Sequence, residues 1–342
     1  MKTFSLYTHY KKILADTITP VSIYLKIRDN YPNSILLESS DYHANDNSFS
    51  YICFNPIASI KVNEDIIEQH YPDGSSKKNY TNKVSVTEEI HKFTKRFKLN
   101  SEADFKFINN GIFGYTAYDA VKYFEDINIS KKPNSLEIPD IYYAVYQNII
   151  AINHFKNEAY IFAHCFETEN NIDEVLQLIN SKNFASYNFK TNSEISSNLT
   201  DSDYKDQVEL AKKHCARGDV FQLVLSKKFS QGFKGDEFNV YRALRSINPS
   251  PYLFYFDYGD FKIFGSSPEA QLIVNKGQAE IHPIAGTFKR TGNDEEDQIL
   301  AKKLAQDDKE NAEHVMLVDL ARNDLSRHGS DVKVVTYREV QF

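Results

Sequence analysis

The stretch KENAEHVMLVDLARNDLSR, residues 309–327, combines acidic and apolar side chains at helical spacing. On a helix of 3.6 residues per turn, Glu310, Glu313 and His314 fall on one stripe. Residues 315–318 are all apolar and point in four directions, so the pattern predicts a helix buried on every side. A carboxylate at the head of such a helix needs a partner, because an unpaired charge out of water is very costly.

Two kinds of partner are compatible with this spacing. Glutamates at positions i and i+3 can present oxygens to one Mg²⁺ ion, which prefers hard oxygen ligands. The alternative is an acidic first turn favoured by the helix dipole, and on spacing alone this is the better interpretation. A zinc site is not indicated, since the stretch has one histidine and no HExxH pattern.

The composition limits the class of protein. A chain of 342 residues with 41% hydrophobic and 13% aromatic residues predicts two domains or one large two-layer body. The cysteines, Cys53, Cys165 and Cys215, are odd in number and far apart, as expected for reduced residues in a cytoplasmic protein. No run approaches eighteen apolar residues, and the first residues lack a secretion signal, so we expect neither a membrane span nor export.

The charge balance argues against a nucleic-acid ligand. The formal net charge is −7, whereas nucleic acid needs a basic face, and the short run KKFSQGFK (227–234) is too small to make one. An anionic ligand would instead require local positive charge, which a metal ion and a few placed cations can supply.

An Asn- and Ser-rich segment at 183–203 lacks apolar periodicity and predicts a linker. Before it, short strand-like runs alternate with helical ones, which indicates an α+β domain. The predicted strands there are 34–40, 48–54, 58–62, 142–152 and 158–166, and the predicted helices are 87–97 and 172–182.

After the linker, a helix is predicted over 202–219, with Ser202 as its N-cap and Gly218 as its end. A long helix is predicted over 294–325, with a possible break near Asp307. Between them we expect a strand-like stretch at 220–233, a helix at 238–248, and a meander of strands at 251–259, 261–267, 270–276 and 278–284.

Five motifs in order carry a family resemblance. They are GDVFQLVLSKKF (218–229), NPSPYLFYF (248–256), FGSSPE (264–269), HPIAGT (282–287) and KENAEHVMLVDLARNDL (309–325). Together they resemble the chorismate-utilising enzymes, and among these the component I family of anthranilate synthases. The N-terminal half resembles the same family more loosely, through SILLESS (34–40) and GIFGYTAYDAVKYFE (111–125).

The resemblance implies an α+β fold, a chorismate-binding-type sandwich of largely antiparallel sheets with helices outside. Residues 1–190 would form an N-terminal α+β domain with part of a tryptophan feedback site. Residues 191–342 would form the first part of the chorismate-binding catalytic domain. Because the family continues beyond the position of Phe342, we expect the fold to be incomplete at its C-terminus, with apolar surface exposed.

The reaction that the resemblance implies converts chorismate and ammonia to anthranilate and pyruvate, in tryptophan biosynthesis. A glutamine amidotransferase subunit supplies the ammonia in the family, and Mg²⁺ is the cofactor. The resemblance assigns the metal to Glu313, with Glu310 in support. It assigns Glu269 as the general acid for the leaving C4 hydroxyl, a step that requires a protonated carboxylic acid. Without the resemblance, Glu269 would be an ordinary exposed glutamate at a strand end.

Gln222 and Ala285 bear on which nucleophile attacks. Relatives that add water to chorismate have a lysine base at the position of Gln222, and those that make aminodeoxychorismate have a lysine in place of Ala285. The Gln222 amide cannot act as a base, and the Ala285 methyl group cannot act as a nucleophile. Both residues therefore favour external ammonia over the two alternatives, isochorismate synthase and aminodeoxychorismate synthase. Gly286 and Thr287 follow Ala285 in a predicted turn, PIAGT. We expect the backbone of this turn to form a wall against the substrate. Singly, Gln222 and Ala285 are also compatible with ordinary packing roles.

A second site is implied by the resemblance, at which L-tryptophan inhibits. It lies between the LLES strand and the NPSPY turn, although NPSP is also simply a good rigid turn. A non-catalytic module that senses tryptophan or binds a subunit is therefore a third alternative. The residues assigned to this inhibitor site are Glu38, Ser39, Asn248, Pro249, Tyr252 and Gly265.

Overall fold

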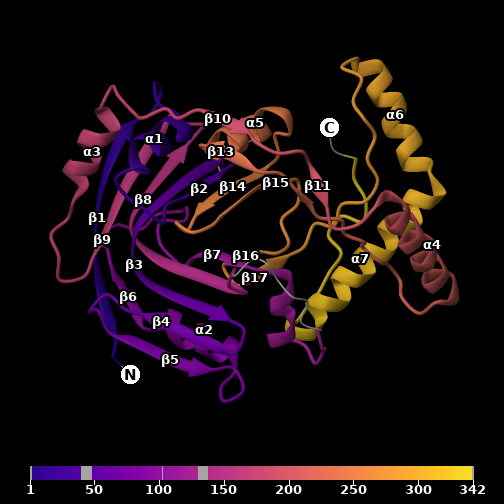
Figure 1. The fold of residues 1–342 in the computed structure, drawn as a ribbon, viewed down its shortest axis with the longest axis horizontal. Coiled ribbons are helices and arrows are strands. Elements are labelled where there is room, and N and C mark those ends of the chain that lie inside the picture. The colour runs from indigo at the N-terminus through magenta and orange to yellow at the C-terminus, as the bar shows by residue number, and fades with distance from the viewer. Residues whose placement is uncertain (1, 40–47, 102, 130–137, 341–342) are drawn as a thin grey trace.

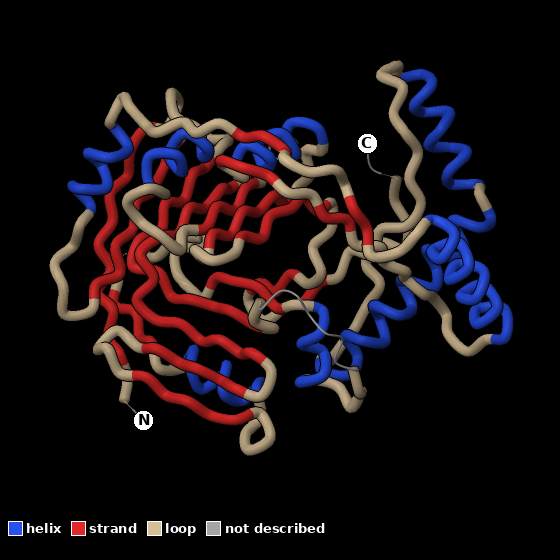
Figure 2. The backbone as a smooth tube through the Cα atoms, viewed as in Figure 1, coloured by secondary structure: helices blue, strands red, loops and turns tan. Residues whose placement is uncertain are grey.

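A computed structural model describes residues 2–39, 48–101, 103–129 and 138–340. Its dominant feature is an 11-stranded sheet with the order β15-β14-β2-β3-β8-β9-β1-β6, in which β4 pairs with β3 and β5, and β7 pairs with β8 (Figures 1 and 2). Every pairing in this sheet is antiparallel except that between β1 and β6. The predicted class, a largely antiparallel sheet with helices outside, is confirmed.

The strands of the large sheet lie mostly before the predicted linker. They are β1 Phe4–Leu14, β2 Ile35–Glu38, β3 Phe49–Asn63, β4 Ile66–His70, β5 Ser76–Tyr80, β6 Phe97–Asn100, β7 Phe113–Thr116, β8 Ile141–Asn153, β9 Glu158–Cys165, β14 Tyr252–Asp257 and β15 Lys262–Ser267.

Three two-stranded sheets lie outside the large one. They consist of β10 Phe189–Thr191 with β13 Phe233–Gly235, β11 Ser196–Ser197 with β12 Phe229–Ser230, and β16 Ile273–Asn275 with β17 Gln278–Glu280.

The helices fall into two groups. Those before residue 190, and α5 after it, are tied to the large sheet, whereas α4, α6 and α7 lie together on the far side of the molecule from β1 and α3 (Figure 1). They are α1 Pro20–Ile27, α2 Val86–Thr94, α3 Ile172–Asn180, α4 Asp201–Arg217, α5 Phe238–Ile247, α6 Asp294–Gln306, α7 Asp308–His328 and the 3₁₀ helix η1 Tyr118–Tyr123.

Apolar residues cover both faces of the large sheet. β8 is buried along nearly its whole length, as expected for a central strand with a packed layer on each side. On one face, α1, α3 and α5 pack onto a cluster that includes Ile23, Ile161 and Tyr255. On the other face, Phe162 and Tyr146 belong to a separate aromatic-rich cluster. The sheet and these helices therefore make the hydrophobic core.

Strands from both sides of the predicted linker share this sheet. β14 pairs with β2 in the register Leu253 to Glu38, and β15 adds the outer strand. The division at residue 190 stays a prediction, but the β14–β15 hairpin belongs to the same sheet as the N-terminal strands.

Two expectations around the linker are wrong in detail. The α4 helix begins after Thr200, whose hydroxyl accepts a hydrogen bond from the Asp203 amide at 3.1 Å while Asp203 bonds back, so that Thr200 rather than Ser202 is the N-cap. Gly218 ends the helix in a left-handed conformation, as predicted. Of the strand predicted over 220–233, residues 221–228 belong to no described strand, although the Lys228 carbonyl accepts a hydrogen bond from the Asn198 amide at 3.2 Å.

The predicted long C-terminal helix is broken where expected, but it is not buried. Asp307 ends α6 and caps α7, accepting hydrogen bonds from the Lys309 and Glu310 amides at 3.0 Å. No residue of α7 is buried, and Val315 is 45% exposed. The prediction of burial is wrong because too little of the described chain packs around this helix.

A buried ion pair joins the first helix to the chain beyond the linker. The Arg28 guanidinium donates from Nη1 and Nη2 to both oxygens of Asp236, at 2.9 and 2.7 Å. The two side chains are only 9% and 10% exposed. Burial opposes the charge, but the hydrogen bonds and charge of Asp236 outweigh it and raise the pKa of Arg28.

We expect Asp236→Asn to lower the free energy of unfolding by about 3 kcal/mol, because it leaves a buried cation with its counter-charge removed. Urea unfolding measures the change. The matched control is Asp29→Asn, since Asp29 lies 3.8 Å from the same guanidinium but is 41% exposed. That control should cost less than about 1 kcal/mol, and equal effects of the two substitutions would contradict the prediction.

Candidate active site and amino-acid site

The predicted general acid, Glu269, lies just beyond the end of β15 in a tight turn. Its amide donates to the Ser267 hydroxyl at 3.3 Å, and that hydroxyl donates to the Glu269 carbonyl at 3.0 Å. The Glu269 side chain is exposed, and its Oε1 accepts a hydrogen bond from the Ile284 amide at 3.4 Å. The carboxylate therefore reaches the residue directly before the predicted Ala285–Thr287 turn.

Gly286, in that turn, lies against the start of α7. Its φ of +73° is in the left-handed region that favours glycine. A Cβ at this position would lie 2.9 Å from Glu310 Oε2 and 2.9 Å from Leu304 Cδ1. Two residues of chain span about 7 Å at most, so Glu269 and Glu310 approach one short segment, 284–286, from two different elements. Thr287, the next residue, is exposed.

The fit of Glu310 and Glu313 to a Mg²⁺ ion can be judged from their surroundings. Glu310 is 24% exposed and has no cation closer than Lys309 Nζ at 3.9 Å among the described residues. Glu313, one turn later, is half-buried. The described part of the chain holds no group of three or more His, Cys, Asp or Glu side chains placed to hold a metal ion. The Glu310 carboxylate beside the Gly286 backbone, with Glu313 three residues later on the same helix, fits an ion that takes few protein ligands and completes its shell with substrate and water.

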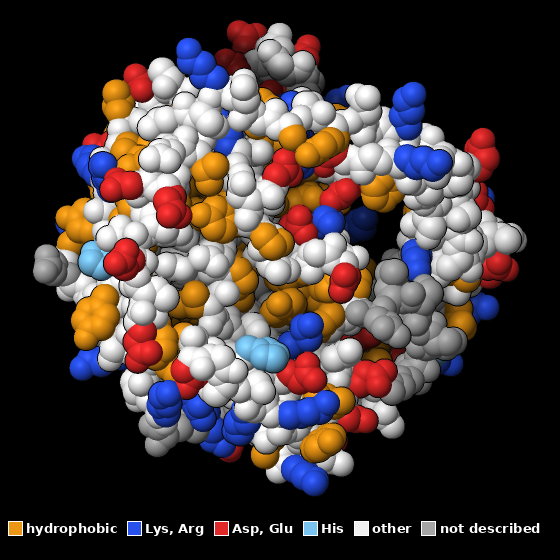
Figure 3. Space-filling view, turned by 60° about the vertical axis from the view of Figure 1, so that its left-hand side comes forward, with side chains coloured by type: hydrophobic (Ala, Val, Ile, Leu, Met, Phe, Trp, Pro, Cys, Tyr) orange, Lys and Arg blue, Asp and Glu red, His pale blue; other side chains and the backbone are white. Residues whose placement is uncertain are grey.

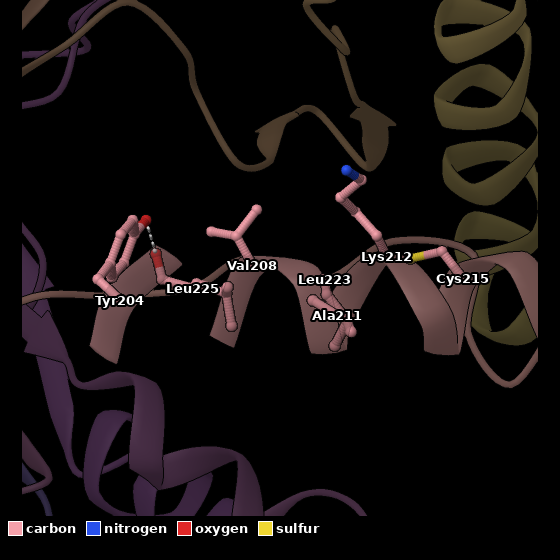
Figure 4. Close-up of a pocket in the computed structure, with 7 residues that line it drawn as sticks. All are labelled: Tyr204, Val208, Ala211, Lys212, Cys215, Leu223 and Leu225. Carbon is pink, nitrogen blue, oxygen red and sulfur yellow. Dashed lines mark hydrogen bonds between the residues drawn. The ribbon is translucent and has the colours of Figure 1, made fainter. Parts of the chain in front are cut away.

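Gln222 lies on a different element from these residues. Gln222 is exposed and directly precedes Leu223. Leu223 and Leu225 lie against residues of α4. These residues line a cavity of about 380 Å³, and the Tyr204 hydroxyl donates to the Leu225 carbonyl at 3.5 Å (Figure 4). The other lining residues are Val208, Ala211, Lys212 and Cys215. Within the described residues, no hydrogen bond joins Gln222 to Glu269, the turn or Glu310.

The predicted inhibitor residues lie on adjoining elements. Glu38 at the end of β2 pairs with Leu253 on β14, so Tyr252 is next to it in the ladder. Gly265 on β15 pairs with Phe254, whose ring lies 2.7 Å from where a Gly265 Cβ would be. Asn248 caps the C-terminus of α5, and its carbonyl accepts a hydrogen bond from Ser266 Oγ at 2.6 Å.

The remaining members of this set flank those elements. Ser39 directly follows β2 and is half-buried, and Pro249 follows Asn248 and is exposed. The residues predicted for an inhibitor site thus lie around β2, β14, β15 and the end of α5.

The Glu38 carboxylate is itself fully engaged. Its side chain is 2% exposed. The Tyr241 hydroxyl donates to Oε2 at 2.6 Å, and Arg245 Nε donates to both oxygens at 3.1 Å. Burial and the adjacent Glu38 charge raise the pKa of Tyr241, so the phenol remains a donor. Glu38 therefore ties β2 to α5 through two side chains.

Tyr241 and Arg245 were not predicted from the sequence as site residues. They stand four residues apart in FNVYRALRSIN and so share one helix face, on which Phe238 is also buried. The signal in the sequence that could have indicated them was an arginine at the end of this apolar helix face. The Arg245 charge also acts on His154, whose Nε2 lies 2.7 Å from Ser50 Oγ. Burial is the larger cause and the Arg245 charge the smaller cause that lowers the pKa of His154.

Comparison with known proteins defines the class of protein to which this fold belongs. The sequence pattern of the chorismate binding enzyme family matches residues 33–341, and the chain belongs to this family. Within the family it is similar to anthranilate synthase component 1 of Aquifex aeolicus, with 34% identity over 343 residues, 95% of this chain and 68% of that protein. The described residues include no helix that is both long and apolar enough to cross a membrane.

Solved structures agree with this relationship. Anthranilate synthase component I from Streptococcus pneumoniae superposes with a TM-score of 0.62 at 27% identity, covering 93% of this chain and 69% of that one. The isochorismate synthase MenF of Escherichia coli superposes with a TM-score of 0.61, covering 95% of this chain and 65% of that one. At 16% identity, this second likeness concerns the fold alone.

Proposed function

We propose that this protein is the large subunit of an anthranilate synthase, a lyase that converts chorismate and ammonia to anthranilate, pyruvate and water. Ammonia forms a bond to ring carbon C2, and the C4 hydroxyl leaves as water. The enolpyruvyl side chain is then eliminated as pyruvate, which leaves the ring aromatic. The observation that carries the proposal is the approach of Glu269 and Glu310 to the single turn at 284–286.

In this proposal Glu269 protonates the leaving C4 hydroxyl, since hydroxide is a poor leaving group. Its exposure leaves it accessible to a substrate, and the Ile284 amide orients one of its oxygens. Ala285 and Gln222 offer no amine or base, which favours free ammonia over a lysine adduct or activated water. The Gly286 backbone would lie against the substrate without a side chain to obstruct it.

Glu313 and Glu310 would hold the Mg²⁺ ion. When bound, the ion supplies positive charge that neutralises the substrate's ring carboxylate, which the chain's net charge of −7 makes necessary. Charges of both signs are interspersed over the face in Figure 3, so local placement has to provide the attraction. We also propose a cytoplasmic enzyme that receives ammonia from a glutamine amidotransferase subunit and is inhibited by L-tryptophan.

The test is incubation of chorismate, ammonium and Mg²⁺ with the purified full-length protein, which includes the whole catalytic domain whose first part residues 191–342 are expected to form. We expect anthranilate, detected by its fluorescence and mass, with formation abolished by EDTA and restored by excess Mg²⁺. Isochorismate or aminodeoxychorismate as the product would overturn the proposal in favour of those reactions.

A second candidate is a non-catalytic module that binds an amino acid. One observation favours it: Glu38 and its donor Tyr241 are buried, whereas Glu269 and Gln222 are exposed. Calorimetry that detects L-tryptophan binding by a chain without chorismate turnover would select this candidate.

A further inference from the structure

Asn110 and Gly111 form the only Asn-Gly pair in the sequence, and they lie on the loop that leads into β7. Both residues are exposed, and neither belongs to a helix or strand. A Cβ built on Gly111 would have no atom within 4 Å apart from its chain neighbours, so the space around this peptide bond is open. Within the described residues, no hydrogen bond is found for the Gly111 amide. The Asn110 side chain and the backbone nitrogen that follows it are therefore both accessible to solvent.

An asparagine side chain can react with the backbone amide of the next residue. The Gly111 nitrogen forms a bond to Cγ of Asn110, and the bond from Cγ to the side-chain nitrogen breaks. Ammonia leaves with the proton that the Gly111 nitrogen gives up, and a cyclic succinimide remains. Water then adds to either carbonyl carbon of the ring and opens it, which yields aspartate or isoaspartate. The net change is amide plus water to carboxylic acid plus ammonia, and nothing is oxidised or reduced.

The residue after the asparagine decides how easily the ring closes. Glycine has no Cβ to obstruct the approach of its nitrogen to Cγ, and it adopts backbone conformations that other residues avoid. The φ of Gly111 is +143°, which L side chains rarely adopt. Asn110 Nδ2 donates a hydrogen bond to Asn109 Oδ1, but this contact is exposed to water, so breaking it costs little. The Asn110 side chain is therefore free to turn toward the Gly111 nitrogen.

Another turn of the same protein has the protection that Asn110 lacks. Asp73 also precedes a glycine, and an aspartate closes the same ring when its carboxyl is protonated. There, the Gly74 amide donates to the Tyr71 carbonyl at 3.0 Å. The hydrogen bond from Lys2 is the largest of the effects that lower the pKa of Asp73, so the carboxyl stays ionised and is a poor electrophile. Both reacting groups are thus engaged at Asp73, whereas the Gly111 nitrogen has no such partner among the described residues.

We propose that Asn110 deamidates spontaneously in the folded protein, as a site of covalent modification that needs no enzyme. The product carries an added negative charge and places a carboxylate, which has no donor, beside Asn109 Oδ1. Isoaspartate also adds a methylene group to the main chain. The Asn109 carbonyl oxygen lies 2.8 Å from His164 Nε2, so the modification falls next to the bond that ties this loop to β9.

The experiment incubates the purified full-length protein, folded and unfolded in urea. Conversion of Asn110 is followed by peptide mass spectrometry in mildly alkaline buffer. Isomerisation of Asp73 is followed by isoaspartate-specific enzymatic methylation in mildly acidic buffer, where part of the carboxyl in the unfolded chain is protonated. The matched variant is Asn110→Gln, because glutamine keeps the amide but has to close a larger ring.

We expect folded protein to deamidate at Asn110 at no less than about one-tenth of the unfolded rate, because exposed loops open at little cost. The rate should rise about tenfold per pH unit, since the attacking nitrogen has to lose its proton. At Asp73, unfolding should raise the rate by more than about tenfold, because it releases the engaged groups. Asn110→Gln should stay unmodified at this position.

Three results overturn the inference. A folded-state rate at Asn110 below about one-tenth of the unfolded rate would show that the fold protects this site. An equal dependence on unfolding at Asn110 and Asp73 would show that the contacts at the two turns do not set their reactivity. Equal conversion in Asn110→Gln would place the modification at another residue.

Discussion

Replacing Glu269 with glutamine should lower the rate of anthranilate formation by about 10²- to 10⁴-fold, the range typical for removal of a general acid. Glutamine keeps the shape of the side chain and its hydrogen bond from the Ile284 amide, but it has no proton to transfer to the leaving hydroxyl. The measurement is kcat for anthranilate, followed by fluorescence with saturating chorismate, ammonium and Mg²⁺.

The control for this substitution is Glu280→Gln. Glu280 is also an exposed glutamate near the end of a strand, but it faces His282, with Nε2 and Oε2 3.4 Å apart. It should change kcat by less than about twofold, since surface substitutions away from special features have small effects. A Glu269→Gln variant that retains most of its kcat would remove Glu269 from the catalytic step.

Replacing Gly286 with alanine should lower kcat by about 100-fold, because small misplacements of groups in an active site can cost that much. The added Cβ would lie 2.9 Å from Glu310 Oε2 and from Leu304 Cδ1. The flexible Glu310 side chain would give way first, which moves a carboxylate that we assign to the Mg²⁺ ion. A higher Mg²⁺ concentration for half-maximal rate should accompany the loss.

Gly292→Ala separates this steric effect from backbone strain. Gly292 has a φ of +83°, close to the +73° of Gly286, but a Cβ there would have no atom within 4 Å. Both variants should therefore lose about 1 kcal/mol of stability from the left-handed conformation, measured by urea unfolding. Only Gly286→Ala should change kcat and the Mg²⁺ requirement; equal kinetic effects would show that the approach to Glu310 has no role.

The elements with strong local signals were predicted well. Alternating and continuous apolar runs indicated β3, β8 and β9, and the Gly218 stop and the break at Asp307 were visible in the sequence. The association of the LLES strand with NPSPY came from the family resemblance. The ladder between β2 and β14 now gives that association a physical form.

The predictions that were wrong or missing concern features that depend on tertiary contacts. The apolar pattern predicted that α7 is buried. Burial requires other parts of the chain to pack around the helix, and α7 has no buried residue. Residues 221–228 have a strand-like pattern, but no described strand forms a ladder with them. Arg245 was overlooked because its partner, Glu38, is 207 residues away in the sequence. No local pattern reports a pair at that separation.

The insertion of β14 beside β2 has a consequence for synthesis of the chain. Ribosomes add about 5 to 20 residues per second, and Arg245 follows Glu38 by 207 residues. For about 10 to 40 s, the nascent polypeptide therefore carries β2 as an unpaired edge, with the acidic group of Glu38 still lacking its cation. A chaperone or the surrounding solvent has to shield that edge during translation, and stalling of the ribosome before the NPSPY codons should favour aggregation.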